Sequence, residues 1–164
     1  MLKNIDPVLS ADLLWILASM GHGDDLALVD ANHPAEAMAR HTASGRLVRL
    51  PGLPIERVAQ AILSVLPLDD FLPDAVRRME VVNDPQTIPD AQRAVMDMVA
   101  DVSGPAPAIA GLERFAFYEA EKKAFAVIQA GDPRPYGCFL FRKGVIAGGR
   151  PLTGKALTEP GLSD

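Results

Sequence analysis

The chain has 164 residues, with 16 Lys and Arg against 21 Asp and Glu, so its formal net charge at pH 7 is −5. This length fits one compact domain, and 49% apolar residues are enough to build a sizeable core. The acidic balance does not favour binding to nucleic acid, and the single cysteine, Cys138, excludes an intramolecular disulfide.

The amino-terminal segment lacks the basic start and the apolar run that secretion requires. No segment reaches the roughly 18 apolar residues that span a bilayer. We therefore expect a cytoplasmic protein that makes no contact with a membrane.

The first half of the chain predicts helices that alternate with short strands. Ser10 is a good helix cap, and Pro54 and Pro67 bound the clearest amphipathic helix. The expected elements are a helix over 10–20, a buried strand over 25–30, a loop over 33–45, a partly exposed strand over 46–50 and a helix over 54–66.

The second half continues the same alternation. Its expected elements are a strand over 75–82, a helix over 89–102, a helix over 115–123, strands over 125–129 and 138–142, and a mobile tail over 147–164. Alternating apolar strands and helices predict an α/β fold. We expect a single layered domain over 1–146, with a mixed, largely parallel sheet flanked by helices.

His22 stands between Gly21 and Gly23, where small neighbours let a ligand approach the backbone and the imidazole. Imidazole exchanges protons near neutral pH, so His22 is a candidate proton-transfer residue. The alternative is a structural role, in which His22 caps the preceding helix or forms a hydrogen bond with a nearby carboxylate.

Asp30 ends the buried strand, and ligand crevices in open α/β sheets lie beyond the carboxyl ends of such strands. Its carboxylate could accept hydrogen bonds from two hydroxyl groups of a ligand. The alternative is an Asx-turn into Ala31 and Asn32, because aspartate commonly begins turns.

Three further side chains are candidates for ligand binding or chemistry. The donors of Arg114 suit a polyhydroxylated or anionic ligand, although such an arginine more often pairs with a surface carboxylate. Tyr136 follows a proline and could face a ligand, or it could be a satisfied buried tyrosine. Cys138 lies in an apolar strand, where thiols are usually inert as nucleophiles.

Metal and nucleotide sites are not expected. A metal site would use residues from the set His22, Asp24, Asp30, His33 and His41, which lack the spacing of known ligand motifs. Neither a glycine-rich phosphate loop nor the Gly-x-Ser-x-Gly turn of a hydrolase is present. The sequence therefore indicates a function without a metal or coenzyme.

Four motifs follow one another along the chain: Met20-Gly21-His22-Gly23-Asp24-Asp25, Asp30-Ala31-Asn32-His33-Pro34, Arg114-Phe115-Ala116-Phe117-Tyr118-Glu119, and Tyr136-Gly137 with Lys143-Gly144-Val145. In this order and spacing they resemble the L-fucose mutarotase branch of the D-ribose pyranase and L-fucose mutarotase family. The resemblance covers residues 1–146.

The resemblance implies a cofactor-free enzyme that interconverts anomers or ring forms of a reducing monosaccharide, built as a ring-shaped homo-oligomer, often a decamer. By position, it assigns proton transfer to His22 and sugar binding to Asp30, Arg114 and the segment from Tyr136 through Gly137 to Cys138. These assignments would place His22 and Asp30 around one cavity. Where the family pattern has asparagine after Tyr-Gly, this chain has Cys138, which removes an amide that donates and accepts.

We therefore expect a mutarotase that exchanges the α and β anomers of L-fucose or a related sugar. Mutarotation needs only acid and base groups, which agrees with the missing cofactor motifs. The alternatives are pyranose–furanose exchange, as in D-ribose pyranase, a non-catalytic sugar-binding regulatory partner of sugar transport, and a structural oligomer without a ligand.

Overall fold

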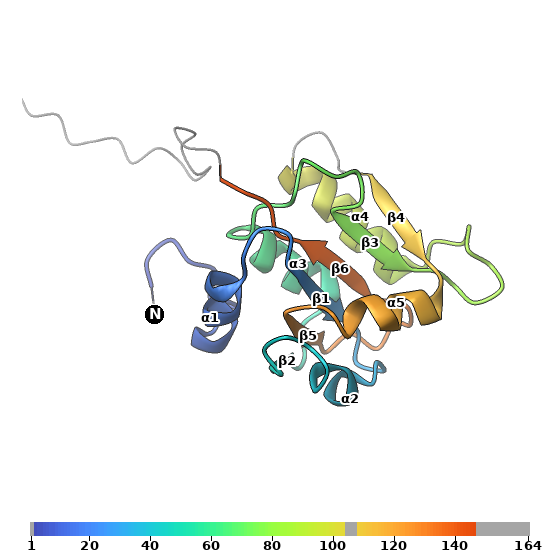
Figure 1. Ribbon diagram of the computed structural model, residues 1–164, viewed down its shortest axis with the longest axis horizontal. Coiled ribbons are helices and arrows are strands. Elements are labelled where there is room, and N and C mark those ends of the chain that lie inside the picture. The colour runs from blue at the N-terminus through green and yellow to red at the C-terminus, as the bar shows by residue number, and fades with distance from the viewer. Residues whose placement is uncertain (1, 104–107, 147–164) are drawn as a thin grey trace, which may run out of the picture.

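A six-stranded sheet with helices on both faces forms the part of the chain that the computed structural model describes, residues 2–103 and 108–146 (Figure 1). The predicted tail over 147–164 lies outside these residues. In spatial order the strands are β2 (Leu47–Leu50), β5 (Ala126–Ala130), β1 (Asp25–Val29), β6 (Phe139–Arg142), β3 (Val76–Met79) and β4 (Ile109–Leu112).

Only β6 runs against its neighbours among the described strands. It is antiparallel to β1 and β3, whereas β2, β5 and β1 are parallel to one another, as are β3 and β4. The prediction of an α/β fold with a mixed, largely parallel sheet is confirmed.

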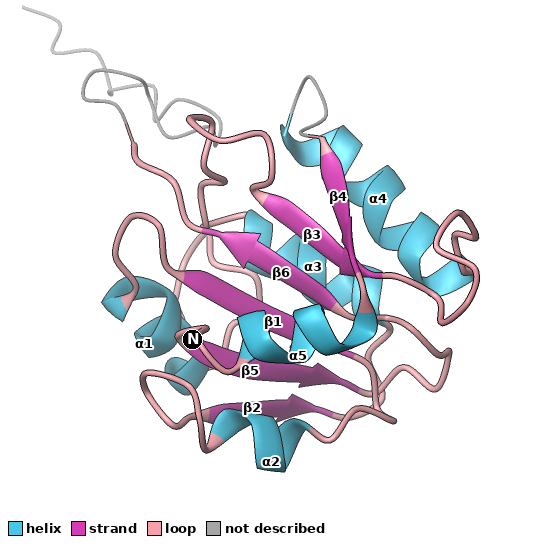
Figure 2. Ribbon diagram, turned by 45° about the vertical axis from the view of Figure 1, so that its right-hand side comes forward, coloured by secondary structure: helices cyan, strands magenta, loops and turns pink. Residues whose placement is uncertain are grey.

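The helices cover both faces of the sheet, as Figure 2 shows. They are α1 (Ala11–Ser19), α2 (Ala35–Ala39), α3 (Ile55–Leu63), α4 (Asp90–Ser103) and α5 (Arg114–Glu121). Side chains of β1 alternate between the two layers: Leu26 and Leu28 pack in the core that contains α1, α3 and α4, and Ala27 and Val29 pack in the core under α2 and α5. None of the described helices has the length and apolar composition needed to cross a bilayer.

Two expectations about local structure are wrong. Residues 35–39 form α2 where a loop was expected, and β4 was not predicted at all. A single helical turn is too short to leave a periodic pattern. Strand β4 is a four-residue edge strand with a glycine at 111, and it is fixed by parallel pairing with β3 rather than by its own composition.

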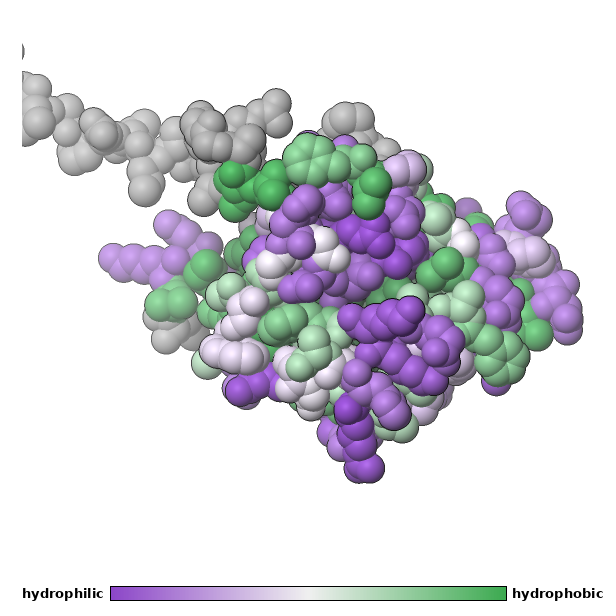
Figure 3. Space-filling view, viewed as in Figure 1, coloured by the Kyte–Doolittle hydropathy of each residue, from purple (hydrophilic) through white to green (hydrophobic). Residues whose placement is uncertain are grey.

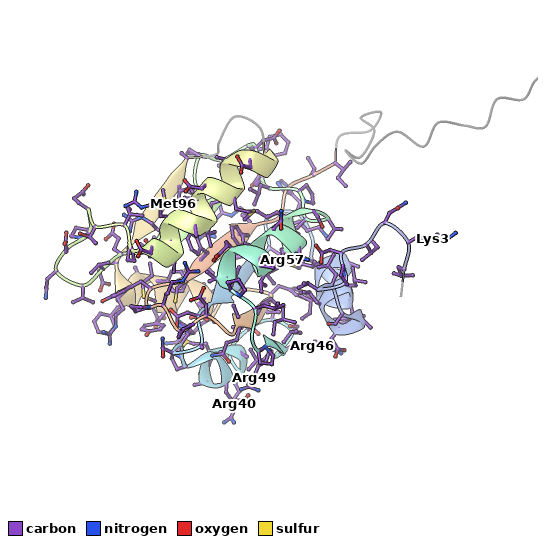
Figure 4. All side chains as sticks on the ribbon, turned by 180° about the vertical axis from the view of Figure 1, so that it is seen from behind. Lys3, Arg40, Arg46, Arg49, Arg57 and Met96 are labelled. Carbon is purple, nitrogen blue, oxygen red and sulfur yellow. The ribbon has the colours of Figure 1, made fainter. Side chains whose placement is uncertain are left out.

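The arginines beside α2 and β2 are neutralised locally. Figure 4 shows Arg40, Arg46 and Arg49 on the same side of the molecule. Arg49 and Arg40 lie 2.9 and 3.7 Å from the carboxylate of Glu36, and Arg46 lies 3.8 Å from Asp12. Because each pair is exposed, each contributes little to stability.

The antiparallel direction of β6 determines which segments meet at each end of the sheet. The start of β6 lies beside the end of β1, since Phe139 pairs with Leu28, and the end of β6 lies beside the start of β1, since Arg142 pairs with Asp25. We call the end that holds residue 30 the carboxyl edge, and the end that holds residues 21–24 the amino edge.

Candidate functional site

A pocket of about 160 Å³ opens at the carboxyl edge of the sheet. Its walls come from the ends of β1 and β3, the segment that leads into β6, and one face of α5. The lining residues are Asp30, Asn32, His33, Pro34, Met79, Arg114, Tyr118, Pro135, Tyr136 and Cys138. The prediction of a crevice beyond the carboxyl ends of the strands matches this location.

Asp30 is held in place by two backbone groups. Its Oδ1 accepts the Asn32 N–H at 2.8 Å, and its Oδ2 accepts the Gly137 N–H at 2.9 Å. The Asx-turn and the pocket are therefore both real, because one carboxylate closes the turn and lines the cavity. Each carboxylate oxygen has a second lone pair, which can accept from a ligand hydroxyl.

Gly137 is not among the lining residues of the pocket, but its N–H holds the Asp30 carboxylate. A Cβ at this position would lie 3.2 Å from both the Asp30 Cβ and the Ile55 Cδ1, tighter than ordinary packing. Only glycine lets this backbone come close enough to donate its N–H to the carboxylate without displacing either neighbour.

Tyr136 has a φ of 63°, a left-handed conformation that is uncommon for a bulky residue. Gln92 stabilises this turn, because its Nε2 donates to the carbonyls of Tyr136 at 2.8 Å and Met79 at 2.6 Å. The Tyr136 hydroxyl accepts the Val82 N–H at 3.4 Å, and the half-buried ring lines the pocket. The strained turn therefore directs a phenol into the site.

An ion pair fixes the loop that carries this turn. The Asp132 carboxylate accepts the first N–H of α3, from Ile55, at 3.0 Å and lies 2.6 Å from the guanidinium of Arg134. The hydrogen bonds from Arg134 lower the pKa of Asp132 to about 2. This buried carboxylate therefore ties residues 131–137 to α3.

We expect Asp132→Asn to reduce the free energy of unfolding by about 2 kcal/mol at pH 7, from the difference between pKa values of 3.8 and about 2. Because the folded pKa is depressed, this stability is present above about pH 4 and is lost as the pH falls through about 2. Urea unfolding at several pH values measures it, with the exposed Glu119→Gln as control. An equal deficit at pH 7 and pH 2 would contradict the assignment.

Helix α5 presents Arg114 and Tyr118 to the pocket, four residues apart on one face. Glu113 caps this helix by accepting from two backbone N–H groups. Arg114 is exposed, with its guanidinium 5.5 Å from the centre of the Phe115 ring. Burial raises the pKa of Tyr118, an effect that the nearby charge of Arg114 partly offsets, so its hydroxyl stays a donor.

Sequence reasoning missed a buried pair at the wall of this pocket. His33 Nε2 lies 2.8 Å from Oε2 of Glu121, and these side chains are 2% and 0% exposed. His33 Nδ1 lies 3.4 Å from the Cys138 sulfur. Helical spacing contained a signal for Glu121, which follows Arg114 by seven residues and so shares its face of α5.

The structure places His22 at the amino edge, outside the pocket. The five residues of β1 separate it from Asp30, about 16 Å at roughly 3.3 Å per residue. Its imidazole is 45% exposed and lies 3.4 Å from the Asp69 carboxylate. The expectation that His22 and Asp30 border one cavity within a chain is wrong.

Apolar side chains stand exposed beside His22. The segment 21–24 contacts the chain after β6, because Gly23 donates to the Lys143 carbonyl, and Gly144 donates in turn to Pro67. The Phe71 ring lies edge-on to His22 at 5.5 Å. Figure 3 shows hydrophobic residues gathered on this face, where the exposed apolar side chains are Phe71, Leu72, Val145 and Ile146.

The pocket combines a carboxylate, a guanidinium and two phenols around a small volume. Such a set of donors and acceptors suits a small polyhydroxylated ligand. Within residues 2–103 and 108–146, no three His, Cys, Asp or Glu side chains gather to hold a metal ion.

Comparisons with known proteins point to one family. The family model described as RbsD / FucU transport protein family matches residues 3–146. The fucose mutarotase of Streptococcus pneumoniae, solved in complex with L-fucose, is 33% identical, with a TM-score of 0.79 over 88% of this chain and 99% of its own. FucU from Bifidobacterium longum is 34% identical, with a TM-score of 0.80 over 88% and 99%.

A third solved structure is more similar in sequence. It is 46% identical, with a TM-score of 0.86 over 89% of this chain and 97% of its own, and it is described provisionally as a sugar-binding protein.

Proposed function

Because this chain belongs to the RbsD / FucU transport protein family, we propose that it is a monosaccharide mutarotase, which exchanges the α and β anomers of L-fucose or a related reducing sugar. The observation that carries this proposal is the pocket at the carboxyl edge, where Asp30, Arg114 and Tyr136 converge from three distant segments. The likeness to a mutarotase that binds L-fucose supports the choice of sugar.

Mutarotation is a proton-transfer reaction. The anomeric hydroxyl loses a proton, the ring oxygen gains one, and the C1–O5 bond opens to give the aldehyde. Rotation about the C1–C2 bond and reclosure on the other face of the carbonyl give the second anomer, with the protons returned. Acid and base groups are sufficient for each step.

The pocket residues bind and orient the sugar in this proposal. Asp30 accepts hydrogen bonds from hydroxyl groups through the lone pair on each oxygen that does not accept a backbone N–H. Arg114 and the phenol of Tyr136, which also line the pocket, donate hydrogen bonds to the sugar. Together these contacts hold the ring while leaving the anomeric carbon open to a proton-transfer group.

We assign that proton-transfer role to His22 of a neighbouring copy in a homo-oligomer. His22 is too far from Asp30 to serve its own pocket, yet its imidazole is exposed and accessible to another copy. The exposed apolar side chains around it supply area that a second copy can cover. A closed ring, such as a decamer, repeats this contact with every site complete.

Saturation-transfer NMR on anomeric protons tests the activity directly. Irradiating the α-anomer of L-fucose should reduce the β signal in the presence of the protein, faster than in buffer. D-ribose, followed in its pyranose and furanose signals, and D-galactose serve as comparison sugars. Exchange of ribose ring forms alone would replace the proposed reaction with a pyranase activity, and background rates for every sugar would contradict both.

A non-catalytic sugar-binding role is the second candidate. The relative at 46% identity is described provisionally as a sugar-binding protein, and His22 lies outside the pocket of its own chain. Calorimetric binding of L-fucose, together with anomer exchange at the background rate, would favour this role over catalysis.

A further inference from the structure

Four polar side chains form a continuous chain of contacts that begins in the wall of the pocket and ends at Glu121 of α5. Glu121 Oε1 and Oε2 lie 3.0 and 2.8 Å from His33 Nε2. His33 Nδ1 lies 3.4 Å from the sulfur of Cys138, which in turn lies 3.7 Å from Asp30 Oδ2. All four residues are at most 8% exposed.

The geometry at Glu121 determines where the imidazole hydrogen lies. Both carboxylate oxygens are within hydrogen-bond distance of the same nitrogen, as expected when one N–H points between them. Nε2 of His33 is therefore the donor. In the neutral ring, Nδ1 is then an acceptor, and it faces the sulfur of Cys138.

Cys138 brings one hydrogen to this chain of contacts. Burial raises the pKa of its thiol well above the usual value, and the charge of Asp30 and the hydrogen bond of the thiol with that carboxylate raise it further. The thiol therefore keeps its hydrogen at neutral pH. Two acceptors compete for that hydrogen, the nearer Nδ1 of His33 and the more distant Oδ2 of Asp30.

We propose that His33, oriented by Glu121, is a positioning residue that draws the Cys138 S–H away from Asp30, so that the Asp30 carboxylate keeps a free lone pair for the sugar. The proposal rests on the proposed function, since it deepens the sugar-binding role of Asp30. Oδ2 already accepts the Gly137 N–H, so one lone pair remains on it. A thiol turned toward Oδ2 would occupy the position that a sugar hydroxyl needs.

The infrared S–H stretching band tests the thiol contact without any sugar. Cys138 is the only cysteine, so the band reports on one residue, and Cys138→Ala should abolish it. The paired replacement His33→Phe with Glu121→Met removes the acceptor and leaves no unpaired buried charge. We expect this variant to shift the band, and the exposed pair His41→Phe with Glu119→Met to leave it in place.

Affinity for L-fucose, measured by calorimetry, tests the consequence for Asp30. The paired replacement at 33 and 121 should raise Kd about three- to tenfold, the effect of one lost hydrogen bond. Adding Cys138→Ala to this variant should then lower Kd, because no thiol remains to occupy Asp30. The same Cys138→Ala change in the native protein should raise Kd, because there it only removes a packed wall of the pocket.

Cys138→Ala is therefore expected to lower Kd in the paired variant and to raise Kd in the native protein. A purely structural role of His33 predicts no such reversal, because a second core replacement would then weaken binding further. A band that stays in place when His33 is replaced would overturn the proposal. A fall in Kd for Cys138→Ala in the native protein would also overturn it, since the thiol would then already donate to Asp30. A shifted band with no L-fucose binding to the native protein would confirm the thiol contact and overturn the proposed sugar.

Discussion

Replacing His22 with alanine is expected to slow anomer exchange by about 10²- to 10⁴-fold, the usual contribution of a positioned acid–base group. The loss should appear in the maximal rate, while L-fucose affinity changes little, because Asp30, Arg114 and Tyr136, the residues proposed to bind the sugar, all remain in place. Saturation-transfer NMR gives the rate, and calorimetry gives the affinity. Equal exchange by the native and variant proteins would remove His22 from the mechanism.

The fold should tolerate this replacement. The His22 side chain is 45% exposed, and its contact with Asp69 is long, at 3.4 Å. Exposed contacts of this kind contribute little to stability. Urea unfolding should therefore give nearly the same free energy for both proteins, so that lost exchange reflects lost chemistry.

Mixed oligomers test whether His22 serves a neighbouring pocket. His22→Ala and Asp30→Ala should each be inactive alone. Co-expressed in equal amounts, they should regain about a quarter of the native activity. A site is complete only when its pocket comes from a His22→Ala subunit and its imidazole comes from an Asp30→Ala subunit. Each of these conditions has a probability of about one half. Mixtures as inactive as the separate variants would contradict a site shared between copies.

The sequence alone was sufficient to predict the carboxyl edge of the site. Asp30 ends a buried strand, and Tyr136 precedes the start of another, so strand ends located both residues. The expectation that His22 and Asp30 border one cavity within a chain was wrong because a motif identifies residue types and not the distances between them. A five-residue strand between residues 22 and 30 already separates their side chains.

Other parts of the site depend on tertiary contacts that no local pattern encodes. His33 and Glu121 are 88 positions apart in sequence and meet only because α2 and α5 cover the same face of the sheet. A buried glutamate also looks like any solvent-facing helix residue in the sequence, because charged side chains are almost never fully buried unless paired. The burial of Glu121 could therefore be recognised only once His33 was located beside it in the structure.

Replacing His33 alone with phenylalanine is expected to reduce the free energy of unfolding by about 3–5 kcal/mol, because it leaves the Glu121 carboxylate buried without a partner. We do not attribute this loss of stability to a poor fit of the phenyl ring, because His33 already packs among aromatic rings. The centres of the Phe117 and Tyr118 rings lie 6.3 and 5.5 Å from the centre of the imidazole. A phenyl ring fits this environment. Urea unfolding of each variant gives the free energies.

Adding Glu121→Met to His33→Phe should restore most of that stability, because replacing both partners of a buried hydrogen bond by apolar groups of similar shape can be nearly neutral. The exposed His41→Phe with Glu119→Met is the matched control, and its free energy should stay within about 0.5 kcal/mol of the native value. A double variant at 33 and 121 that is less stable than His33→Phe alone would show that packing, and not the unpaired charge, causes the loss. A double variant whose free energy of unfolding returns close to the native value would show that the buried Glu121 charge makes these two residues depend on each other.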